Sequence, residues 1–567
     1  MTTEPKSLVA PGQNHFDVAI VGSGFGGSVA ALRLTEKGYR VLVLEAGARF
    51  ADQDFARTSW NLRKFLFFPR LGLLGIQRID LISNVMVMSG AGVGGGSLVY
   101  ANTLYRPSDA FFKTGSWAGM CDWQQELEPY YYQAEAMLGV VQNPFESNSD
   151  RAVRRVADRL GFGGSYRPTP VGIRFGRPGV TEADPYFGGA GPSRAGCTNC
   201  GECMTGCRHN AKNTLPKNYL HLAEAAGASV WPLTTATNLI RTDAGWVLTT
   251  KATARGGQTT RVSADQVIVA AGALGTAKLL QRVRAAGGLR GLSGRLGYLS
   301  RTNSESLLGV VSRQPEPDFS EGSAITSSVY PNPDTHIEPV RYGKGSNFMA
   351  VLQSVIASGS RGQRPTPARW LAASLKNLTR LPKFYNLRHW SQRTVILLVM
   401  QARDNSLITS LRRGLFGTRI VSRQGHGEPN PSWVPSGHEF ARELAKDIDG
   451  TPGAVTTEAF GVPMTAHFLG GCTIADSAAE GVVDGYLRAF GEPGLHIWDG
   501  SVLSANPGVN PSLSITALAE WAAAHWPNRG QEDARPALGA SFKVVEPVAP
   551  AKPTVPKQAP AAYLIGA

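Results

Sequence analysis

The chain has 567 residues, of which 42% are hydrophobic and 65 are glycine. A chain of this length is expected to form two or more domains, and this composition fits a globular α/β protein with many tight turns. The formal net charge of +14 at pH 7 favours contact with acidic surfaces such as anionic lipid. The sequence lacks the dense Lys/Arg blocks of nucleic-acid-binding arms, so we expect no nucleic-acid partner.

The sequence predicts neither a signal peptide nor a membrane-spanning helix. Residues 1–12 contain no apolar segment of the kind that signal peptides carry, and no run approaches the ~18 apolar residues of a spanning helix. The longest apolar stretch, Val395–Met400, is typical of a buried strand. We therefore expect a protein that is cytoplasmic or peripheral to the membrane, and export would need an unusual route.

Residues 16–47 predict a complete βαβ unit. The apolar run Val18–Val21 leads into glycines at 22, 24 and 27. A helical segment at Ala30–Glu36 follows, and a second apolar run, Val41–Leu44, ends at Glu45. Gly22 permits a tight turn, Gly24 lets the backbone approach a pyrophosphate, and Gly27 lets helix and strand pack closely. The helix N-terminus would face the phosphates, and Glu45 would accept hydrogen bonds from a ribose. The unit therefore predicts a site for the ADP part of a dinucleotide.

A second glycine-rich segment covers residues 88–104. So many glycines indicate that a ligand or another chain segment comes close to the backbone. Residues 120–160 then show the periodicity of helices, and the Pro/Gly-rich span 163–195 is expected to be mostly loop.

Four cysteines, Cys197, Cys200, Cys203 and Cys207, follow this loop. Their spacing matches the ligand run of bacterial ferredoxins, except that Arg208 replaces the usual proline. Four thiolates on one loop can hold an iron–sulfur cluster or a tetrahedral zinc ion. Buried thiols or redox disulfides without metal are the alternative. The other two cysteines, at 121 and 472, are isolated and expected in the core.

The second half of the chain alternates between the two expected domains. Short strands between 228 and 275 lead into a helix at Ala277–Arg282, and residues 305–400 predict an antiparallel sheet interrupted by an insertion. Within it, residues 368–390 combine Trp, Leu and Phe with Arg and Lys, which suits a helix lying on a membrane interface. A packed helix with a solvated basic face is the alternative. Residues 465–526 return to strand–loop–helix patterns, and the Pro/Ala-rich tail 531–567 is expected to be disordered or to wrap the surface.

Four motifs, in this order, resemble those of the glucose–methanol–choline (GMC) oxidoreductases, whose cofactor is FAD. They are the N-terminal dinucleotide unit, Gly-Ala-Gly-Val-Gly-Gly-Gly-Ser-Leu-Val at 90–99, His-Phe-Leu-Gly-Gly-Cys at 467–472, and the segment 499–520. Segments 139–144, 334–347 and 424–431 are most similar to the actinobacterial cholesterol oxidase branch of that family. The resemblance covers residues 15–530.

The resemblance implies an α/β fold in which a Rossmann-like FAD-binding domain is interleaved with a substrate domain built on a mixed β-sheet. The FAD-binding domain would consist of residues 15–48, 208–300 and 480–530, with a flavin loop at 88–104. The substrate domain would consist of residues 49–207 and 301–479, and would include the cysteine cluster at 197–207.

The resemblance also implies FAD-dependent oxidation of the 3β-hydroxyl of cholesterol or a related sterol, with Δ5→Δ4 isomerisation to the 4-en-3-one. His467 would help to deprotonate the hydroxyl, Asn510 would contact flavin and substrate, and Glu338 would move the proton between steroid carbons. Without the resemblance, His467 could be a core residue, and Glu338 could form an ion pair with Arg341 or Lys344. The residues expected at the cofactor are Gly22, Gly24, Phe25, Gly27, Glu45, Gly90, Gly95, Ser97, Ala101, Asn102, Ala236, Asp499, Gly500 and Asn510.

Two other interpretations stay open. One is an FAD dehydrogenase of another bulky alcohol, with an iron–sulfur centre carrying electrons away, and the other is an electron carrier without a substrate. A carrier has no use for a substrate-facing base, which argues against the second. Residues 100–103, Tyr-Ala-Asn-Thr, replace the Asn-Gly-Gly-Met frequent in sterol oxidases, and Ser512 replaces a phenylalanine. The electron acceptor, oxygen or another compound, therefore stays open as well.

Overall fold

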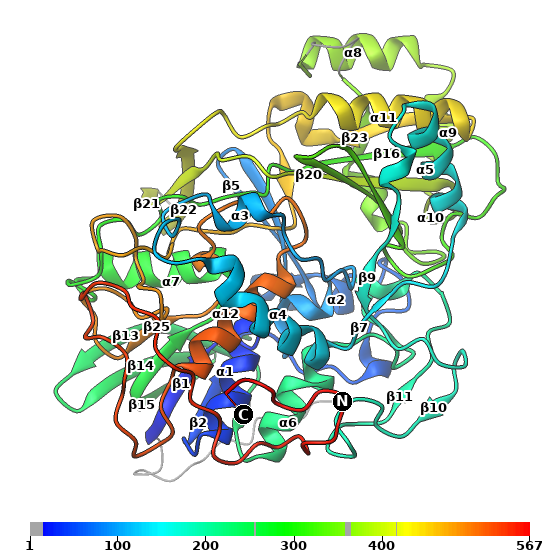
Figure 1. The fold of residues 1–567 in the computed structure, drawn as a ribbon. Coiled ribbons are helices and arrows are strands. Elements are labelled where there is room, and N and C mark those ends of the chain that lie inside the picture. Colours follow the sequence, from blue (N-terminus) through cyan, green and yellow to red (C-terminus); the bar gives the residue numbers. More distant parts are fainter. Residues whose placement is uncertain (1–14, 255–256, 358–363, 415–416, 567) are drawn as a thin grey trace.

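The computed structural model describes residues 15–254, 257–357, 364–414 and 417–566. The N-terminal segment, in which no signal peptide was found, lies outside the described residues. The chain forms two large sheets at opposite ends of the molecule (Figure 1). They confirm the predicted α/β fold with a Rossmann-like domain joined to a second sheet-based domain.

The first sheet runs in the order β12-β2-β1-β15-β14-β13, with β25 also pairing with β15. Its core is parallel, whereas β13, β14 and β15 pair antiparallel. The βαβ unit is continuous, since β1 and β2 flank the helix α1 and both strands are almost wholly buried. The strands are β1 (His15–Val21), β2 (Val41–Leu44), β12 (Ser229–Trp231), β13 (Thr234–Thr242), β14 (Gly245–Ala252), β15 (Thr259–Val269) and β25 (Leu495–Ile497).

Helix α1 packs against two other helices that come from distant parts of the sequence, α12 and α6. A buried ion network holds them together. The Arg33 guanidinium on α1 donates to both carboxylate oxygens of Glu520 on α12, at 2.8 and 2.9 Å, and the Tyr219 hydroxyl on α6 donates to the same carboxylate at 2.6 Å. The helices of this domain are α1 (Phe25–Glu36), α4 (Trp123–Leu138), α6 (Tyr219–Ala225), α7 (Ala273–Ala285) and α12 (Ser512–Ala524).

The second sheet has the order β19-β23-β16-β20-β18-β17-β8. Its pairings among the described residues are antiparallel, so mixed pairing occurs in the first sheet rather than here. Helices α5 (Asn148–Arg159) and α11 (Pro435–Asp447) share an apolar core with this sheet. The strands are β8 (Arg167–Pro168), β16 (Ser306–Ser312), β17 (Ser327–Asn332), β18 (Thr335–Val340), β19 (Gln353–Val355), β20 (Thr394–Gln401) and β23 (Gly450–Val455).

The predicted insertion interrupts this sheet between β19 and β20. It contains α8 (Pro367–Lys376), α9 (Leu381–Phe384) and α10 (Trp390–Arg393), and it follows the short 3-10 helix η7 (Phe348–Leu352). Helix α8 stands at the outer edge of the molecule, beyond α11 (Figure 1). In the described part of the chain, no helix is both long enough and apolar enough to cross a membrane.

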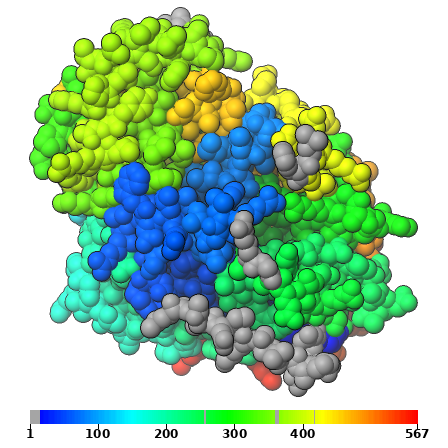
Figure 2. All heavy atoms as spheres, turned by 180° about the vertical axis from the view of Figure 1, so that it is seen from behind, coloured from blue at the N-terminus to red at the C-terminus, as the bar shows by residue number. Residues whose placement is uncertain are grey.

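Residues 50–90 form a layer between the domains of the first and the second sheet. Figure 2 shows this layer in blue on the rear face. This layer contains α2 (Leu62–Phe65), β3 (Phe67–Phe68), β4 (Leu73–Leu74), β5 (Gln77–Ile82) and β6 (Val85–Gly90), and β6 pairs with β24 (Met464–Thr465). Apart from short 3-10 helices, the remaining elements are α3 (Asp109–Phe112), β7 (Val140–Gln142), β9 (Pro170–Gly172), β10 (Thr181–Glu182), β11 (Arg194–Ala195), and the hairpin of β21 (Leu407–Gly414) and β22 (Gly417–Gln424).

The tail beyond residue 530 wraps around the first domain. The Thr554 backbone N–H donates to the Glu36 carboxylate at 2.7 Å, and the Leu564 N–H donates to the Gln133 side chain at 3.0 Å. Val555, Ala561 and Ile565 are buried in the core of this domain. Of the two states expected for the tail, the structure shows the wrapped one.

Candidate functional site

A cavity of about 590 Å³ lies between the two sheets. One side is formed by the glycine-rich turn after β1, by the flavin loop and by the segments around 499–500 and 510–512. The other side is formed by aliphatic side chains of the second sheet, among them Leu307, Val340, Ile396 and Leu398. The cavity therefore joins a nucleotide-binding edge to an apolar chamber.

The glycines of the βαβ unit differ in their surroundings. Gly22 has a φ of +104°, and a Cβ there would lie 2.2 Å from the Ala270 carbonyl oxygen. A Cβ on Gly27 would lie 2.1 Å from the Gly22 oxygen, so this position serves helix packing and does not line the cavity. A Cβ on Gly24 would meet nothing within 4 Å, because this residue faces the cavity. Open space at Gly24, at the start of α1, suits a pyrophosphate.

Glu45 is buried at the end of β2 and lines the cavity. One carboxylate oxygen accepts hydrogen bonds from the backbone N–H and hydroxyl of Ser23, at 3.1 and 2.6 Å. The other accepts from the N–H groups of Gly47 and Gly92, at 2.8 and 3.4 Å. Glu45 thus connects the dinucleotide turn to the flavin loop, and its hydrogen bonding to a ribose stays a prediction.

The structure separates the other predicted cofactor residues into two groups. Phe25, Gly90, Gly95, Ala101, Ala236, Asp499, Gly500 and Asn510 line the cavity. Ser97 and Asn102 do not. The Ser97 hydroxyl donates to the Gly94 carbonyl at 2.7 Å and accepts from the Leu215 N–H at 3.1 Å, while Asn102 is fully buried with a φ of +71°. The Ser97 hydroxyl therefore holds the flavin loop in place, and the buried Asn102 lies outside the cavity lining.

His467 lines the cavity and forms a pair with Glu305, a residue that the sequence motifs do not identify. The Nδ1 atom of His467 contacts a carboxylate oxygen of Glu305, whose side chain is completely buried at the start of β16. The other oxygen of Glu305 accepts from the Ala466 N–H at 2.8 Å. Because Nδ1 is engaged, a ligand in the cavity can bond to this imidazole only through Nε2.

Asn510 joins the cavity to Glu338. The hydrogen-bond network orients the Asn510 amide nitrogen toward Glu338, with distances of 3.1 and 3.3 Å to the two carboxylate oxygens. Glu338 is completely buried on β18 and lies behind Asn510, outside the residues that line the cavity. Burial raises the pKa of the Glu338 carboxyl to about 8. This carboxyl therefore retains its proton at neutral pH.

The predicted ion-pair alternative for Glu338 is not formed within the described residues. The Arg341 guanidinium donates to the Ser323 carbonyl at 2.5 Å and to the hydroxyls of Ser147 and Thr326 at 2.8 and 2.9 Å. The nearest basic side chain recorded for Glu338 is His336, at 4.0 Å.

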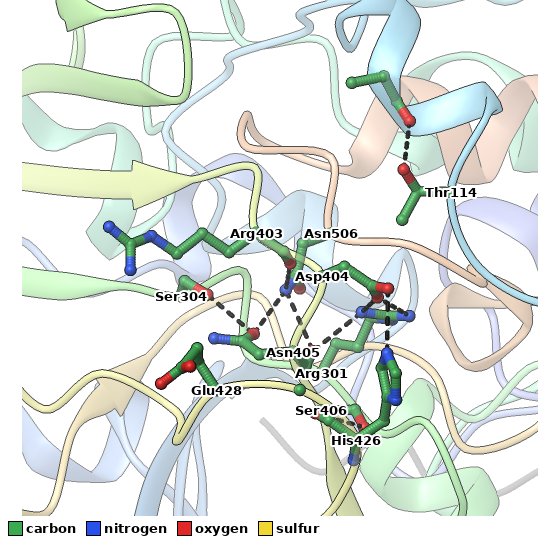
Figure 3. Close-up of polar contacts among 12 residues, drawn as sticks. Thr114, Arg301, Ser304, Arg403, Asp404, Asn405, Ser406, His426, Glu428 and Asn506 are labelled. Atoms are coloured by element: carbon green, nitrogen blue, oxygen red, sulfur yellow. Dashed lines mark hydrogen bonds and ion pairs between the residues drawn. The ribbon is translucent and has the colours of Figure 1, made fainter.

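A polar network behind the site fixes the segments that carry Glu305 and Asn510 (Figure 3). Arg301 donates to the Asp404 carboxylate at 3.0 Å and to the Asn405 carbonyl at 2.9 Å. The Asn405 side-chain oxygen accepts from Ser304 and from Asn506, both at 3.0 Å. The loop at 403–406 therefore connects residues 301–305 with the loop that leads to Asn510.

The four predicted metal-ligating cysteines lie around one small cavity of about 10 Å³. Among the described residues, no three of their sulfur atoms fall within 4.8 Å of one another. Burial raises the pKa of the thiols of Cys197, Cys200 and Cys203, the first two to about 12, so these groups are protonated thiols. The prediction of a cluster on Cys197, Cys200, Cys203 and Cys207 finds no support, because the fold turns their sulfurs apart.

This cysteine loop is connected to the flavin loop through Lys212. The completely buried Lys212 ammonium donates to the carbonyls of Leu98, Tyr100 and Cys203 at 3.0, 2.8 and 2.8 Å. Burial lowers its pKa to about 7. Met204, next along the loop, lines the large cavity.

Comparison with known proteins agrees with this architecture. Residues 192–286 and 422–519 match the models of the N- and C-terminal parts of GMC oxidoreductases, and residues 20–52 match an NAD(P)-binding Rossmann-like domain. A cholesterol oxidase of Mycobacterium tuberculosis is 54% identical over 96% of this chain and 97% of its own length. A cholesterol oxidase of Acinetobacter baumannii is 41% identical over 90% and 94%.

A solved structure shares the fold at low sequence identity. Pyridoxine 4-oxidase from Mesorbium loti superposes with a TM-score of 0.57 at 18% identity, covering 89% of this chain and 98% of that one.

Proposed function

Because this chain belongs to the GMC oxidoreductase family, we propose that it oxidises the 3β-hydroxyl of cholesterol or a related sterol to the ketone. The observation that carries the proposal is the single cavity that joins His467 and Asn510 to an apolar chamber. A fused-ring sterol is a large apolar ligand with one hydroxyl, and such a ligand needs an apolar chamber with few polar groups. The two relatives named cholesterol oxidase match nearly the whole chain, including both walls.

FAD is the cofactor of the family, and the residues present fit it. The open face of Gly24 leaves room for a pyrophosphate, and a Cβ on Gly95 would lie 2.7 Å from the Gly24 Cα, so the two glycine segments approach closely. Helices α1 and α12 both begin at the cavity wall, and their positive ends favour an anionic ligand. When bound, FAD supplies the acceptor for the hydride that leaves the alcohol carbon.

His467 acts as the base in the proposed oxidation. Its Nε2 atom takes the hydroxyl proton, and the Glu305 carboxylate at Nδ1 stabilises the imidazolium that forms. The Asn510 amide, held by Glu338, lies at the same cavity wall and orients the hydroxyl by hydrogen bonding. Oxygen is the proposed electron acceptor, in keeping with the relatives named oxidases.

We further propose that Glu338 carries out a Δ5→Δ4 isomerisation of the ketone. Two observations support this proposal. The Glu338 carboxyl has a pKa of about 8, and the Asn510 side chain lies between this carboxyl and the cavity that would hold the substrate. The carboxylate form would take a proton from one steroid carbon and return it to another, which requires Asn510 or Glu338 to turn toward the ring.

An exposed apolar patch suggests how a sterol reaches the cavity. Val351, Leu371, Leu375, Leu378 and Phe460 are each more than half exposed. Leu371 and Leu375 lie on helix α8, which contacts β19 and the short helix that ends at Phe460. Met349 and Leu352, on either side of Val351, line the cavity. Basic residues occur in the same segment of the chain, at positions 369, 376, 380 and 383. We propose that this surface rests on a lipid bilayer, with the protein peripheral to the membrane.

The test is an anaerobic absorption spectrum of the FAD-loaded enzyme before and after adding cholesterol. Bleaching of the flavin bands, followed by hydrogen peroxide formation when air is admitted, is the expected result. A flavin that cholesterol leaves oxidised, but that another bulky alcohol bleaches, would refute the sterol assignment. Bleaching without peroxide would refute oxygen as the acceptor.

A further inference from the structure

Three metal-ligating side chains meet on the outer side of the cysteine loop. Cys200, Glu202 and His209 each place one ligand atom within 4.8 Å of the others. The Nε2 atom of His209 lies 3.6 Å from a carboxylate oxygen of Glu202, which exceeds hydrogen-bond length. That same oxygen is buried without a hydrogen-bond partner among the described residues. A buried carboxylate oxygen without a hydrogen bond, beside an imidazole and a thiol, is a candidate ligand for a cation.

Among the described residues, no nearby basic side chain donates a hydrogen bond to that oxygen. The Arg208 guanidinium donates to the carbonyls of Gln53 and Phe55, at 2.8 and 2.6 Å. The Lys212 ammonium is occupied by the three carbonyls described above. The negative charge of Glu202 can therefore be compensated at this oxygen by a protonated His209 or by a cation bound between the two side chains.

We propose that Cys200, Glu202 and His209 bind one Zn²⁺ ion. Nitrogen and oxygen ligands at about 2.0–2.1 Å from a tetrahedral zinc are separated by roughly 3.3 Å, close to the observed 3.6 Å. The adjoining cavity of about 10 Å³ has space for about one water molecule or ion, not for several irons and sulfides. Binding forms a Zn–S bond and releases the Cys200 thiol proton to solvent, and water occupies the fourth position.

The ion would fasten the cysteine loop to the substrate domain. The Gly322 N–H donates to the Asn199 carbonyl at 2.8 Å, and a Cβ on Gly201 would lie 2.3 Å from the Ser320 oxygen, so the loop already packs closely there. Two residues beyond Glu202, Met204 lines the sterol cavity. An ion that holds the cysteine loop in place would thus also hold part of the cavity wall in place. The ion itself would take no part in the oxidation.

The experiment uses FAD-loaded full-length protein, loaded with zinc, passed through a desalting column and analysed for metal. We expect about one zinc per chain, and on replacement by Co²⁺ a thiolate-to-cobalt charge-transfer band in the difference spectrum. Cys200→Ser should abolish that band, and His209→Ala should weaken binding by about 10-fold or more. Cys121→Ser is the control, because Cys121 is an isolated thiol that is partly buried like Cys200, and this variant should keep both zinc and band.

Flavin content shows whether each variant has folded. His209 is 40% exposed, so His209→Ala remains informative if Cys200→Ser loses its flavin. Substoichiometric zinc in the wild type would overturn the proposal. Zinc that is retained equally by the wild type, Cys200→Ser and His209→Ala would also overturn it, because such binding lies elsewhere on the surface.

Discussion

Replacing Glu305 by glutamine removes the negative charge beside His467 and keeps an oxygen that can accept from Nδ1. Glu305 is completely buried, so the carboxylate and the imidazolium interact in a region poorly screened by water. Two unit charges about 4 Å apart at an effective dielectric constant of about 20 attract by about 4 kcal/mol, and a neutral hydrogen bond recovers part of this. If the transition state loses about 2–4 kcal/mol of stabilisation, oxidation slows by about 30- to 1,000-fold.

The assay is stopped-flow reduction of the flavin by sterol without oxygen. We expect the limiting reduction rate to fall while the sterol concentration at half-saturation is unchanged, since Glu305 does not contact the substrate. Glu458→Gln is the matched control. Glu458 forms another buried carboxylate–imidazole pair, with His438 at 3.1 Å, and does not line the cavity. A Glu305→Gln enzyme that reduces within twofold of the wild-type rate would refute the reasoning.

Four further predictions concern the same cavity and its entrance. His467→Ala should slow flavin reduction by about 10²–10⁴-fold while FAD content is unchanged, and retained turnover would exclude His467 as the base. Glu338→Gln should leave oxidation intact but let the 5-en-3-one accumulate, whereas an unchanged product ratio would exclude the isomerase role. In the wild type, isomerisation should increase from pH 7 to 9, because the raised pKa of about 8 leaves Glu338 protonated below that pH and charged above it. Leu375→Asp with Leu378→Asp should lower turnover of sterol in anionic vesicles several-fold and spare detergent-solubilised sterol. Equal losses in both assays would contradict membrane docking.

Local patterns in the sequence were sufficient to predict the βαβ unit of the nucleotide-binding domain. The predicted second strand coincides with β2 (Val41–Leu44), and the glycine turn leads into α1 as expected. Helix α1 nevertheless begins at Phe25, five residues before the predicted helical segment, because packing of Gly26 and Gly27 outweighs their low helix propensity. The antiparallel strands of residues 305–400 and their insertion were also predictable from alternation and composition.

What the sequence could not reveal depends on contacts between distant residues. Glu305 is 162 residues from His467, and nothing in its own neighbourhood marks it as a partner of the base. The cysteine spacing indicated four converging thiols, whereas the loop conformation brings Cys200 to Glu202 and His209 instead. Motif matching likewise predicts Ser97 and Asn102 at the cofactor; neither residue lines the cavity, and a role for them in cofactor binding stays a prediction.

The wrapped tail makes the C-terminus a poor place to modify this protein. The Lys37 ammonium at the end of α1 donates to the Val548 carbonyl at 2.6 Å, and the Tyr563 ring lies 4.6 Å from the Arg33 guanidinium. Proteolysis near residue 530 would remove these contacts from the helix whose other end lines the cavity, at the proposed pyrophosphate site. If the tail is cleaved during storage or purification, the first sign should therefore be loss of FAD, seen as yellow absorbance that passes through an ultrafiltration membrane.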